Sequence, residues 1–163
     1  MPVVDVSTEP EQLTATFVCE LPATPETIWR IWAEPRLLER WWGPPGYPVT
    51  VAAHDFTVGG IVEYAMTGPD GERFPGGMQF VSITPGGALS FRDYFLGEDG
   101  QPSQDLGTTT EVAIEPLDAG RARMTMVSRF PSREAMAELE AMGAVEGMTG
   151  ALGQLDDVLA SLD

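Results

Sequence analysis

The clearest local indications of secondary structure lie in residues 24–46, which read TPETIWRIWAEPRLLERWWGPPG. Thr24 is a favourable helix N-cap, and Pro25 suits the first helical position because no backbone N–H is needed there. Pro35 interrupts this helix, since proline cannot continue the hydrogen-bond ladder, and begins a second one over residues 35–41. The GPPG run that follows ends the second helix. We therefore predict two short consecutive helices.

Alternation of apolar and polar residues predicts strands on both sides of this stretch. The predicted strands cover residues 13–21, 47–56, 61–67, 78–83, 89–96, 108–115 and 121–130. Their connections contain glycine, proline or aspartate, as hairpin turns require, so about seven strands are expected to form one curved antiparallel sheet. Residues 1–11 are expected to be a loose leader, and residues 12–163 a single domain.

The chain is predicted to be helical from Ser132, a capping residue, to its end. One face of this helix carries an apolar stripe formed by Met148, Leu152, Leu155, Leu159 and Leu162. Glycines at 143, 147, 150 and 153 either break the helix or face something that needs room. A long helix is the obvious cover for the apolar face of a curved sheet, so we expect an α+β fold in which the sheet wraps around it.

The composition excludes several classes of protein. The chain has 163 residues, of which 43% are apolar and 21% charged, as is typical of one globular domain. One cysteine excludes an internal disulfide, and one histidine, His54, excludes multi-histidine metal sites. All nine basic residues are arginine, which excludes Schiff-base chemistry on lysine. The net charge of −16 argues against binding to nucleic acid or anionic membranes. We expect no metal and no cofactor.

The sequence shows no targeting segment. The N-terminus is acidic and lacks the basic flank and apolar core of a signal peptide. No apolar run approaches the ~18 residues that span a bilayer. A cytoplasmic protein without membrane contact is expected.

The order of these motifs resembles a known family. The likeness is carried by Pro25 to Trp32, Pro35 to Leu38, Arg40 to Pro44, Asp55 with Gly59-Gly60, Tyr64 to Gly71, Phe80 with Ile83, Pro85, Leu89 and Phe91, Phe130 to Ser132, and Gly147 to Gly150. These residues are similar to the signature of the activator of heat-shock protein 90 ATPase homologue-like proteins. That family is a branch of the START-related helix-grip (SRPBCC) superfamily, which also holds Bet v-type allergens and polyketide cyclases. Two positions depart from the pattern: Ser82 stands where an acid is frequent, and His54 where an aromatic residue is frequent.

The resemblance implies a helix-grip fold with a deep apolar cavity between the sheet and the C-terminal helix. We expect this cavity to bind a hydrophobic or aromatic small molecule. The candidates for its lining are Trp42, Tyr64, Met66, Phe80, Phe91, Asp93, Met124, Met126, Met148 and Leu152. Asp93 shares the inward parity of Leu89 and Phe91, and a buried carboxylate is costly. Either the strand bends there, or Asp93 faces a wet pocket and orients the ligand together with the Tyr64 hydroxyl.

Two alternatives stay open. The first is a polyketide-cyclase- or dehydratase-like enzyme that uses acid–base chemistry in the same cavity. No serine or threonine has a convincing activating partner, because His54 lacks a third member, so no catalytic residue is assigned. The second is an interaction module that regulates a chaperone, as the family name suggests.

Three further expectations concern surfaces and single residues. The outer side of the first helices and the strand 13–21, taken as a sheet edge, are candidate surfaces for a homodimer. Cys19 lies in the apolar parity of that strand and is expected to be inert core. His54 is expected to be satisfied by a local hydrogen bond.

Overall fold

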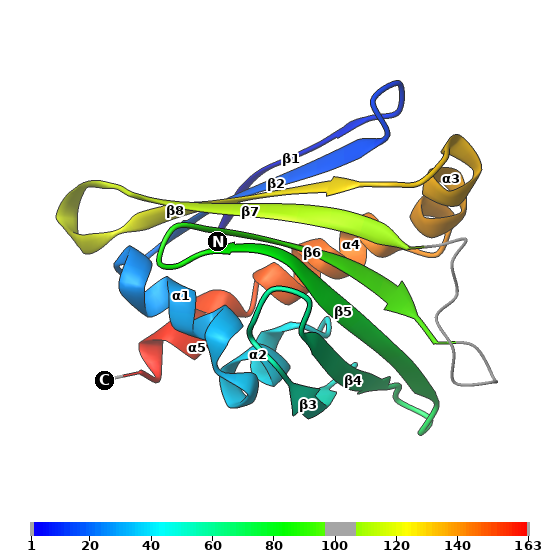
Figure 1. Ribbon diagram of the computed structural model, residues 1–163, viewed down its shortest axis with the longest axis horizontal. Helices are drawn as coiled ribbons and strands as arrows, with labels where there is room; N and C mark the ends of the chain where they lie inside the picture. Colours follow the sequence, from blue (N-terminus) through cyan, green and yellow to red (C-terminus); the bar gives the residue numbers. More distant parts are fainter. Residues whose placement is uncertain (1, 97–106, 163) are drawn as a thin grey trace.

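Within the residues that the structure describes, 2–96 and 107–162 of a computed structural model, eight strands form one antiparallel sheet (Figure 1). They lie in the order β1-β2-β8-β7-β6-β5-β4-β3. Their bounds are β1 (Val3–Glu9), β2 (Thr14–Leu21), β3 (Val49–His54), β4 (Ile61–Thr67), β5 (Arg73–Thr84), β6 (Ala88–Phe95), β7 (Thr108–Pro116) and β8 (Ala122–Arg129). A 3₁₀ turn at Asp118–Gly120 joins β7 to β8. The chain has the predicted α+β architecture.

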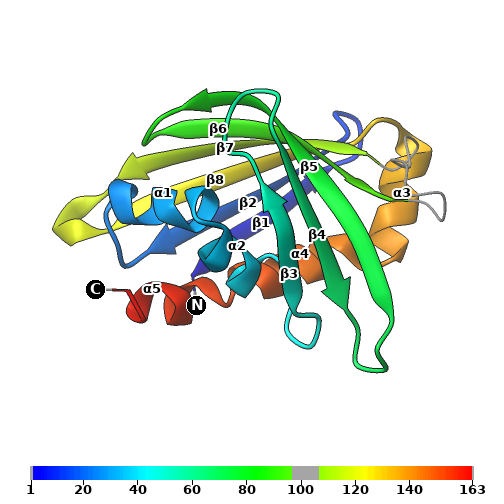
Figure 2. The same ribbon diagram turned by 60° about the horizontal axis from the view of Figure 1, so that its bottom comes forward.

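The sheet curves around a C-terminal helical region made of α3 (Arg133–Ala141), α4 (Ala144–Leu152) and α5 (Leu155–Ala160). Figure 2 shows α4 and α5 crossing the concave face of the sheet, with α2 (Pro35–Trp41) beside α5 and α1 (Pro25–Ala33) next to α2. Together these helices cover the apolar face of the sheet, which cannot be left in water. No helix in the described residues is long and apolar enough to cross a membrane.

The two helices after β2 form where their local signals predict. The Thr24 hydroxyl accepts a hydrogen bond from the Thr27 backbone N–H at 3.4 Å, and Pro25 is the first residue of α1. The helix ends at Ala33, and the backbone N–H of the next residue, Glu34, donates to the Arg30 carbonyl oxygen. The next residue, a proline, begins α2, so both helix bounds are confirmed.

Residues 3–9 are not part of a loose leader, because they form the edge strand β1. This strand pairs antiparallel with β2, with Val6 opposite Phe17. Most of its side chains are exposed, and its sequence therefore lacks a clear alternation of apolar and polar residues. The strand is held instead by backbone hydrogen bonds to β2. As a result, the strand predicted at 13–21 does not lie at the edge of the sheet, and the edges are β1 and β3.

β5 also differs from its prediction. It begins before the expected strand 78–83 and runs through Pro75, Gly76 and Gly77. These residues have weak strand propensity, but β4 and β6 flank them and supply pairing partners on both sides.

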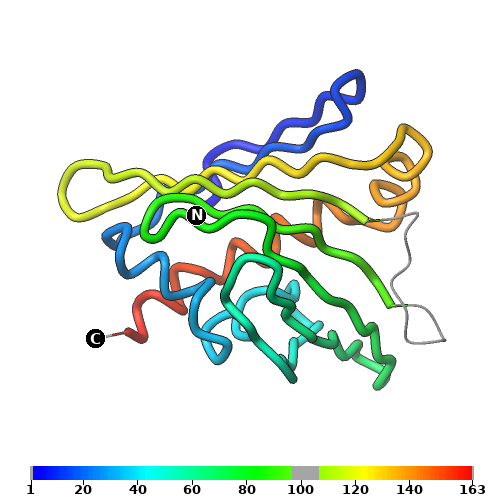
Figure 3. The backbone as a smooth tube through the Cα atoms, in the orientation of Figure 1, coloured from blue at the N-terminus to red at the C-terminus, as the bar shows by residue number. Residues whose placement is uncertain are grey.

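The predicted long C-terminal helix is divided into α3, α4 and α5 in the described residues (Figure 3). Gly143 has a φ angle of +85°, in the left-handed region that other residues rarely adopt, and it separates α3 from α4. Gly153 follows the last residue of α4. Two of the four glycines therefore mark the interruptions in the helix.

The other two glycines make room for the loop after α2. Pro44 and Pro45 pack against the face of α4 that carries Gly147 and Gly150. A Cβ atom on Gly150 would lie 3.2 Å from Cδ of Pro45, closer than an ordinary van der Waals contact. Both explanations offered for the glycines, the break and the close approach, are therefore confirmed at different positions.

The tryptophans of the first helices form the centre of the core. Trp32 and Trp41 pack edge to face with ring centroids 4.9 Å apart, and Trp41 and Trp42 do so at 5.4 Å. The Trp32 indole N–H donates to the sulfur of Met124 on β8 at 3.5 Å. The Trp41 indole N–H donates to the Ile31 carbonyl oxygen at 3.2 Å. This packing fastens α1 and α2 to the sheet.

Gly43 is the point where the loop after α2 folds back on itself. It is buried, and a Cβ atom there would lie 2.0 Å from the Tyr47 carbonyl oxygen. The side-chain amide of Gln154 donates to the Gly43 carbonyl oxygen at 2.7 Å and to the Trp41 carbonyl oxygen at 3.3 Å. These bonds join the loop to the junction between α4 and α5.

We expect Gly43→Ala to lower the free energy of unfolding by about 1–3 kcal/mol or more, because the added methyl group meets backbone that cannot move aside freely. Urea unfolding of the variant measures this loss. Gly87→Ala is the matched control, since a Cβ atom at Gly87 meets nothing within 4 Å. Equal stability of the two variants would contradict the account of the loop.

Candidate functional site

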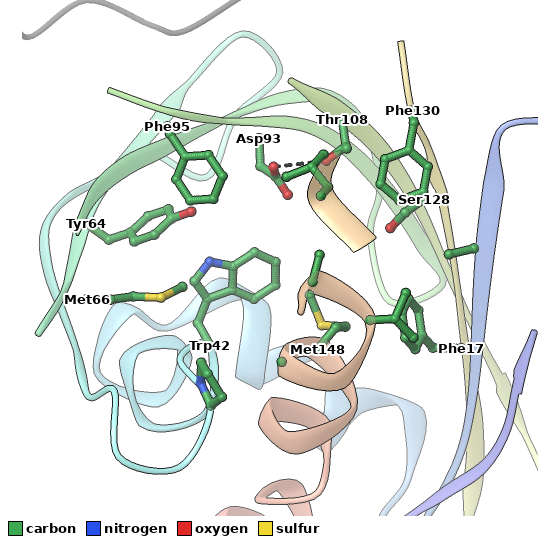
Figure 4. A pocket seen from close by; sticks show the side chains of 16 residues that line it. Phe17, Trp42, Tyr64, Met66, Asp93, Phe95, Thr108, Ser128, Phe130 and Met148 are labelled. Carbon is green, nitrogen blue, oxygen red and sulfur yellow. Dashed lines mark hydrogen bonds between the residues drawn. The ribbon is translucent and has the colours of Figure 1, made fainter. Parts of the chain in front are cut away.

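A cavity of about 230 Å³ lies between the concave face of the sheet, α4 and the loop after α2 (Figure 4). Its walls are mostly apolar and aromatic. The lining residues are Ala15, Phe17, Trp42, Pro44, Tyr64, Met66, Asp93, Phe95, Thr108, Ser128, Phe130, Leu139, Ala144, Val145, Gly147 and Met148. None of these is basic, and the few polar groups among them are described next.

Tyr64 is positioned by a glycine on the neighbouring strand. In the sheet register Tyr64 of β4 lies opposite Gly76 of β5, which in turn lies opposite Phe95 of β6. A Cβ atom on Gly76 would lie 2.9 Å from the Tyr64 hydroxyl oxygen. The missing side chain therefore lets the Tyr64 ring lie over Gly76, with its hydroxyl in the cavity.

Asp93 faces the cavity because β6 keeps its alternation. The inward residues Leu89 and Phe91 are followed by Asp93 and Phe95. The irregularity in this part of the sheet lies on β5 between Phe80 and Ser82, not at Asp93. The sequence allowed either a bend in the strand or a carboxylate in a pocket. The structure shows the carboxylate in a pocket.

Among the described residues, one side chain donates a hydrogen bond to the Asp93 carboxylate. Thr108, directly opposite on β7, donates from its hydroxyl at 2.9 Å. Burial raises the pKa of Asp93 from 3.8 to about 6, and the Thr108 hydrogen bond opposes this rise. Burial, and next the nearby Asp93 charge, raise the pKa of Tyr64 as well, so its phenol stays protonated. Asp93 is thus a carboxyl group that changes charge close to neutral pH.

Trp42 brings an indole N–H to the same cavity. Its side chain is only 4% exposed, and its N–H has no hydrogen-bond acceptor in residues 2–96 and 107–162. Figure 4 shows the indole nitrogen on the side of the ring that faces the Tyr64 hydroxyl. This N–H opposes the rise in the pKa of Tyr64, but the two groups do not reach hydrogen-bond geometry.

A second polar pair lies on β7 and β8. The hydroxyl groups of Thr110 and Ser128 share a hydrogen bond of 2.9 Å, and these residues are register partners. The Ser128 hydroxyl is therefore already partnered inside the protein, unlike the Trp42 N–H.

Half of the predicted lining lies at the cavity. Trp42, Tyr64, Met66, Asp93 and Met148 line it. The others are fully or almost fully buried in the core away from it: Phe80, Phe91, Met124, Met126 and Leu152. They have the predicted buried environment, but the helices and their tryptophans fill the space next to them. Phe91, for example, packs against Trp32 at 5.5 Å.

Several lining residues were missed, although some carried a signal. Ala15, Phe17, Ser128 and Phe130 already lay on the apolar parity of their strands. The sequence does not show which end of the sheet the helices leave uncovered. These residues therefore could not be distinguished from residues of the packed core.

The single histidine and cysteine have local roles. His54 Nε2 lies 3.0 Å from the Trp32 carbonyl oxygen, which satisfies it. Cys19 is fully buried, and burial followed by the Asp156 charge raises the pKa of its thiol to about 12, so it is not a reactive thiolate. In the part of the chain that the structure describes, no group of three or more His, Cys, Asp or Glu residues could hold a metal ion.

The raised pKa of Asp93 predicts a pH-dependent cost to stability. The native carboxyl binds its proton more tightly than the unfolded one, so it favours the folded state at low pH and this benefit is lost as pH rises from about 4 to about 6. We expect Asp93→Asn to be more stable than the wild type at pH 7.5 by on the order of 1–2 kcal/mol, less than the full pKa shift would give because Asp93 is partly exposed to solvent. The difference should disappear near pH 4.

Urea unfolding at the two pH values measures this difference. Asp70→Asn, in an exposed turn, is the control for the general effect of removing one negative charge. If both variants gain the same stability at pH 7.5, the gain reflects net charge and the burial account of Asp93 fails.

Comparison with known proteins places the chain in a family. The model for "Activator of Hsp90 ATPase homolog 1-like protein" matches residues 22–160. No curated protein matches the chain. A solution structure from Arthrobacter aurescens is 45% identical, with a TM-score of 0.94, and the alignment covers 98% of this chain and 93% of that one. A crystal structure from Mycobacterium smegmatis is 39% identical, with a TM-score of 0.89 and coverage of 98% and 99%.

A more distant crystal structure, from Rhodobacter sphaeroides, is 22% identical, with a TM-score of 0.82 and coverage of 97% and 99%, and it shows the same fold. The family match spans most of the sheet and all the helices described above. It confirms the resemblance that the WWGP stretch and its neighbouring motifs indicate. This chain belongs to the Activator of Hsp90 ATPase homolog 1-like family.

Proposed function

We propose that the cavity binds a small hydrophobic or aromatic molecule. The observation that carries this proposal is a preformed space of about 230 Å³ with apolar walls and a few polar groups turned inward. Small-molecule sites in proteins have this composition. The volume is below the ~300–1,000 Å³ of sites for drug-sized molecules and above the ~150 Å³ that accepts benzene. A ligand of one or two rings fits this range.

The walls suit such a ligand. Phe17, Phe95 and Phe130 offer aromatic surface, and Met66 and Met148 offer flexible side chains that adapt to different shapes. Burial of the ligand's apolar surface would supply the affinity. Asp93 and the Tyr64 hydroxyl would orient it.

Naphthalene is a suitable test ligand because it carries no polar group. We expect it to shift the NMR signals of pocket residues such as Met66 and Met148 in the wild-type protein. Ala144→Leu should weaken this binding by about tenfold or more, because the larger side chain enters the cavity from α4. Native mass spectrometry of the gently purified protein, before and after denaturation, would show whether a cellular ligand is bound.

Ala137→Leu is the matched control, since Ala137 is exposed on α3 and does not line the cavity. Naphthalene should bind this variant as it binds the wild type. Binding that is unaffected by Ala144→Leu would mean that naphthalene binds elsewhere, and the proposal would fail.

A second candidate function is acid–base catalysis in the same cavity. It is favoured by one observation, the carboxyl group of Asp93 with its pKa raised to about 6 by burial. A carboxyl group with such a pKa accepts and returns protons efficiently near neutral pH. The Tyr64 hydroxyl lies in the same cavity and could donate a hydrogen bond to a substrate oxygen.

This candidate predicts proton exchange in a ketone probe. The wild-type protein should accelerate deuterium uptake at the α-carbon of 2-tetralone in D₂O, and the rate should rise as pH passes through about 6. Asp93→Asn should bind 2-tetralone without accelerating exchange, whereas Asp70→Asn should behave as the wild type. No acceleration by the wild type would remove this candidate for ketones. A chaperone-regulating role rests on the family's name alone, and we do not propose it.

A further inference from the structure

The three core tryptophans differ in one respect that bears on the ligand. Trp32 and Trp41 are fully buried, and each donates its indole N–H to an atom of the protein. Trp42 is almost as deeply buried, yet its N–H finds no acceptor in the described part of the chain. Buried donors are rarely left without a partner, because the hydrogen bonds they made to water are lost. The exception is the tryptophan that lines the cavity.

The Tyr64 hydroxyl is a second free donor in the same place. Its oxygen faces the Trp42 indole N–H without reaching hydrogen-bond geometry, so the hydroxyl proton can be directed at a ligand. Its position is set by Gly76, over which the ring lies, and by edge-to-face packing on Trp42 with centroids 6.3 Å apart. Figure 4 shows the phenol oxygen pointing into the cavity and the indole nitrogen on the side of the Trp42 ring that faces this oxygen. Neither the indole N–H nor the phenol O–H is held by a well-formed hydrogen bond, so both can donate to one acceptor atom on a ligand that enters beside them.

The charges around the cavity select against an anionic acceptor. Asp93 lies in the same cavity, and its negative charge adds to burial, the larger cause, in raising the pKa of the Tyr64 phenol. No lining residue is basic, and the whole chain carries a net charge of −16. A carboxylate ligand would place a second negative charge in a small apolar space without a counter-ion.

We propose that the cavity selects uncharged aromatic carbonyl compounds, whose carbonyl oxygen accepts hydrogen bonds from the Trp42 indole N–H and the Tyr64 hydroxyl, and that it rejects aromatic carboxylates. This inference rests on the proposed ligand-binding function. It adds the chemical class of the ligand and the two residues that recognise it.

Three naphthalene derivatives separate the contributions of apolar contact, of hydrogen bonding to a carbonyl oxygen and of ligand charge to the affinity. 2-Acetylnaphthalene carries the carbonyl group. 2-Isopropenylnaphthalene has nearly the same shape with a CH₂ group in place of the oxygen, and 2-naphthoate carries a carboxylate. Their affinities are measured by NMR titration at pH 8, where Asp93 is ionised. We expect the ketone to bind and to move the Trp42 indole proton signal downfield, the alkene to bind without that shift, and the naphthoate to bind at least about tenfold more weakly than the ketone.

Two variants test the two donors. Trp42→Phe removes the N–H and keeps an aromatic ring, and Tyr64→Phe removes only the hydroxyl. Each should weaken binding of 2-acetylnaphthalene by about threefold to tenfold, as expected for one hydrogen bond, and change binding of 2-isopropenylnaphthalene by less than about twofold. The ratio between the two ligands cancels any loss of apolar contact that a variant causes. If Trp42→Phe does not fold, Tyr64→Phe still gives the test.

Matched controls use residues outside the cavity. Trp29→Phe removes an indole N–H from α1, and Tyr94→Phe removes a phenol hydroxyl next to Gly77; neither residue lines the cavity. Both should bind all three compounds as the wild type does. Asp93→Asn should strengthen binding of 2-naphthoate by removing the repulsion.

The outcomes are distinct. A selective loss of ketone binding in the two variants supports the inference. Equal effects on ketone and alkene, or naphthoate as the tightest ligand, would overturn the inference and leave ligand binding intact. If none of the three compounds binds, the proposed function itself fails, and the inference fails with it.

Discussion

The contact between the Gly43-Pro44-Pro45 loop and the glycine face of α4 is the constraint on which the site depends. Gly43 allows the loop to fold back, and Gly147 and Gly150 allow its prolines to approach the helix closely. Gln154 then joins the helix to the carbonyl groups of the same loop. Pro44 and Gly147 are also walls of the cavity. The distance between helix and sheet, and hence the space beneath the helix, follows from this contact.

The concave face of the sheet has two parts, one filled and one hollow. Under α1 and α2, the tryptophans and Phe91 pack in edge-to-face and tilted pairs and fill the space, as a core at normal density requires. Under α4, small residues such as Ala144 and Gly147 leave room, and the cavity lies there. Trp42 belongs to both parts, because its ring packs in the core and also lines the cavity, with the indole nitrogen on the side that faces the Tyr64 hydroxyl.

The polar groups at the cavity carry a cost that the rest of the core avoids. Asp93 gives up hydration of its charge, and the Trp42 N–H gives up a hydrogen bond, whereas Trp32 and Trp41 are fully satisfied. Natural sequences depart from the rules of stable packing mainly at functional sites. The coincidence of both departures in one cavity is a stronger argument for ligand recognition than the shape of the cavity alone. A bound carbonyl oxygen would relieve one cost, and protonation of Asp93 would relieve the other.

The sequence by itself determined the features that depend on neighbouring residues. The cap at Thr24 and the proline at 35 placed α1 and α2, because these signals act over a few residues. The alternation on β6 put Asp93 on the inward side only if the strand did not bend, and the structure shows that it does not. Only the tertiary structure decided the others. β1 forms because β2 offers it a backbone edge, and Phe80 and Met126 lie in the core, whereas Phe17 and Phe130 line the cavity, because of where the helices cross the sheet. Alternation along a strand shows on which face of the sheet a side chain lies. Which part of that face the helices cover depends on residues distant in sequence. Alternation alone therefore cannot distinguish a packed core from a pocket.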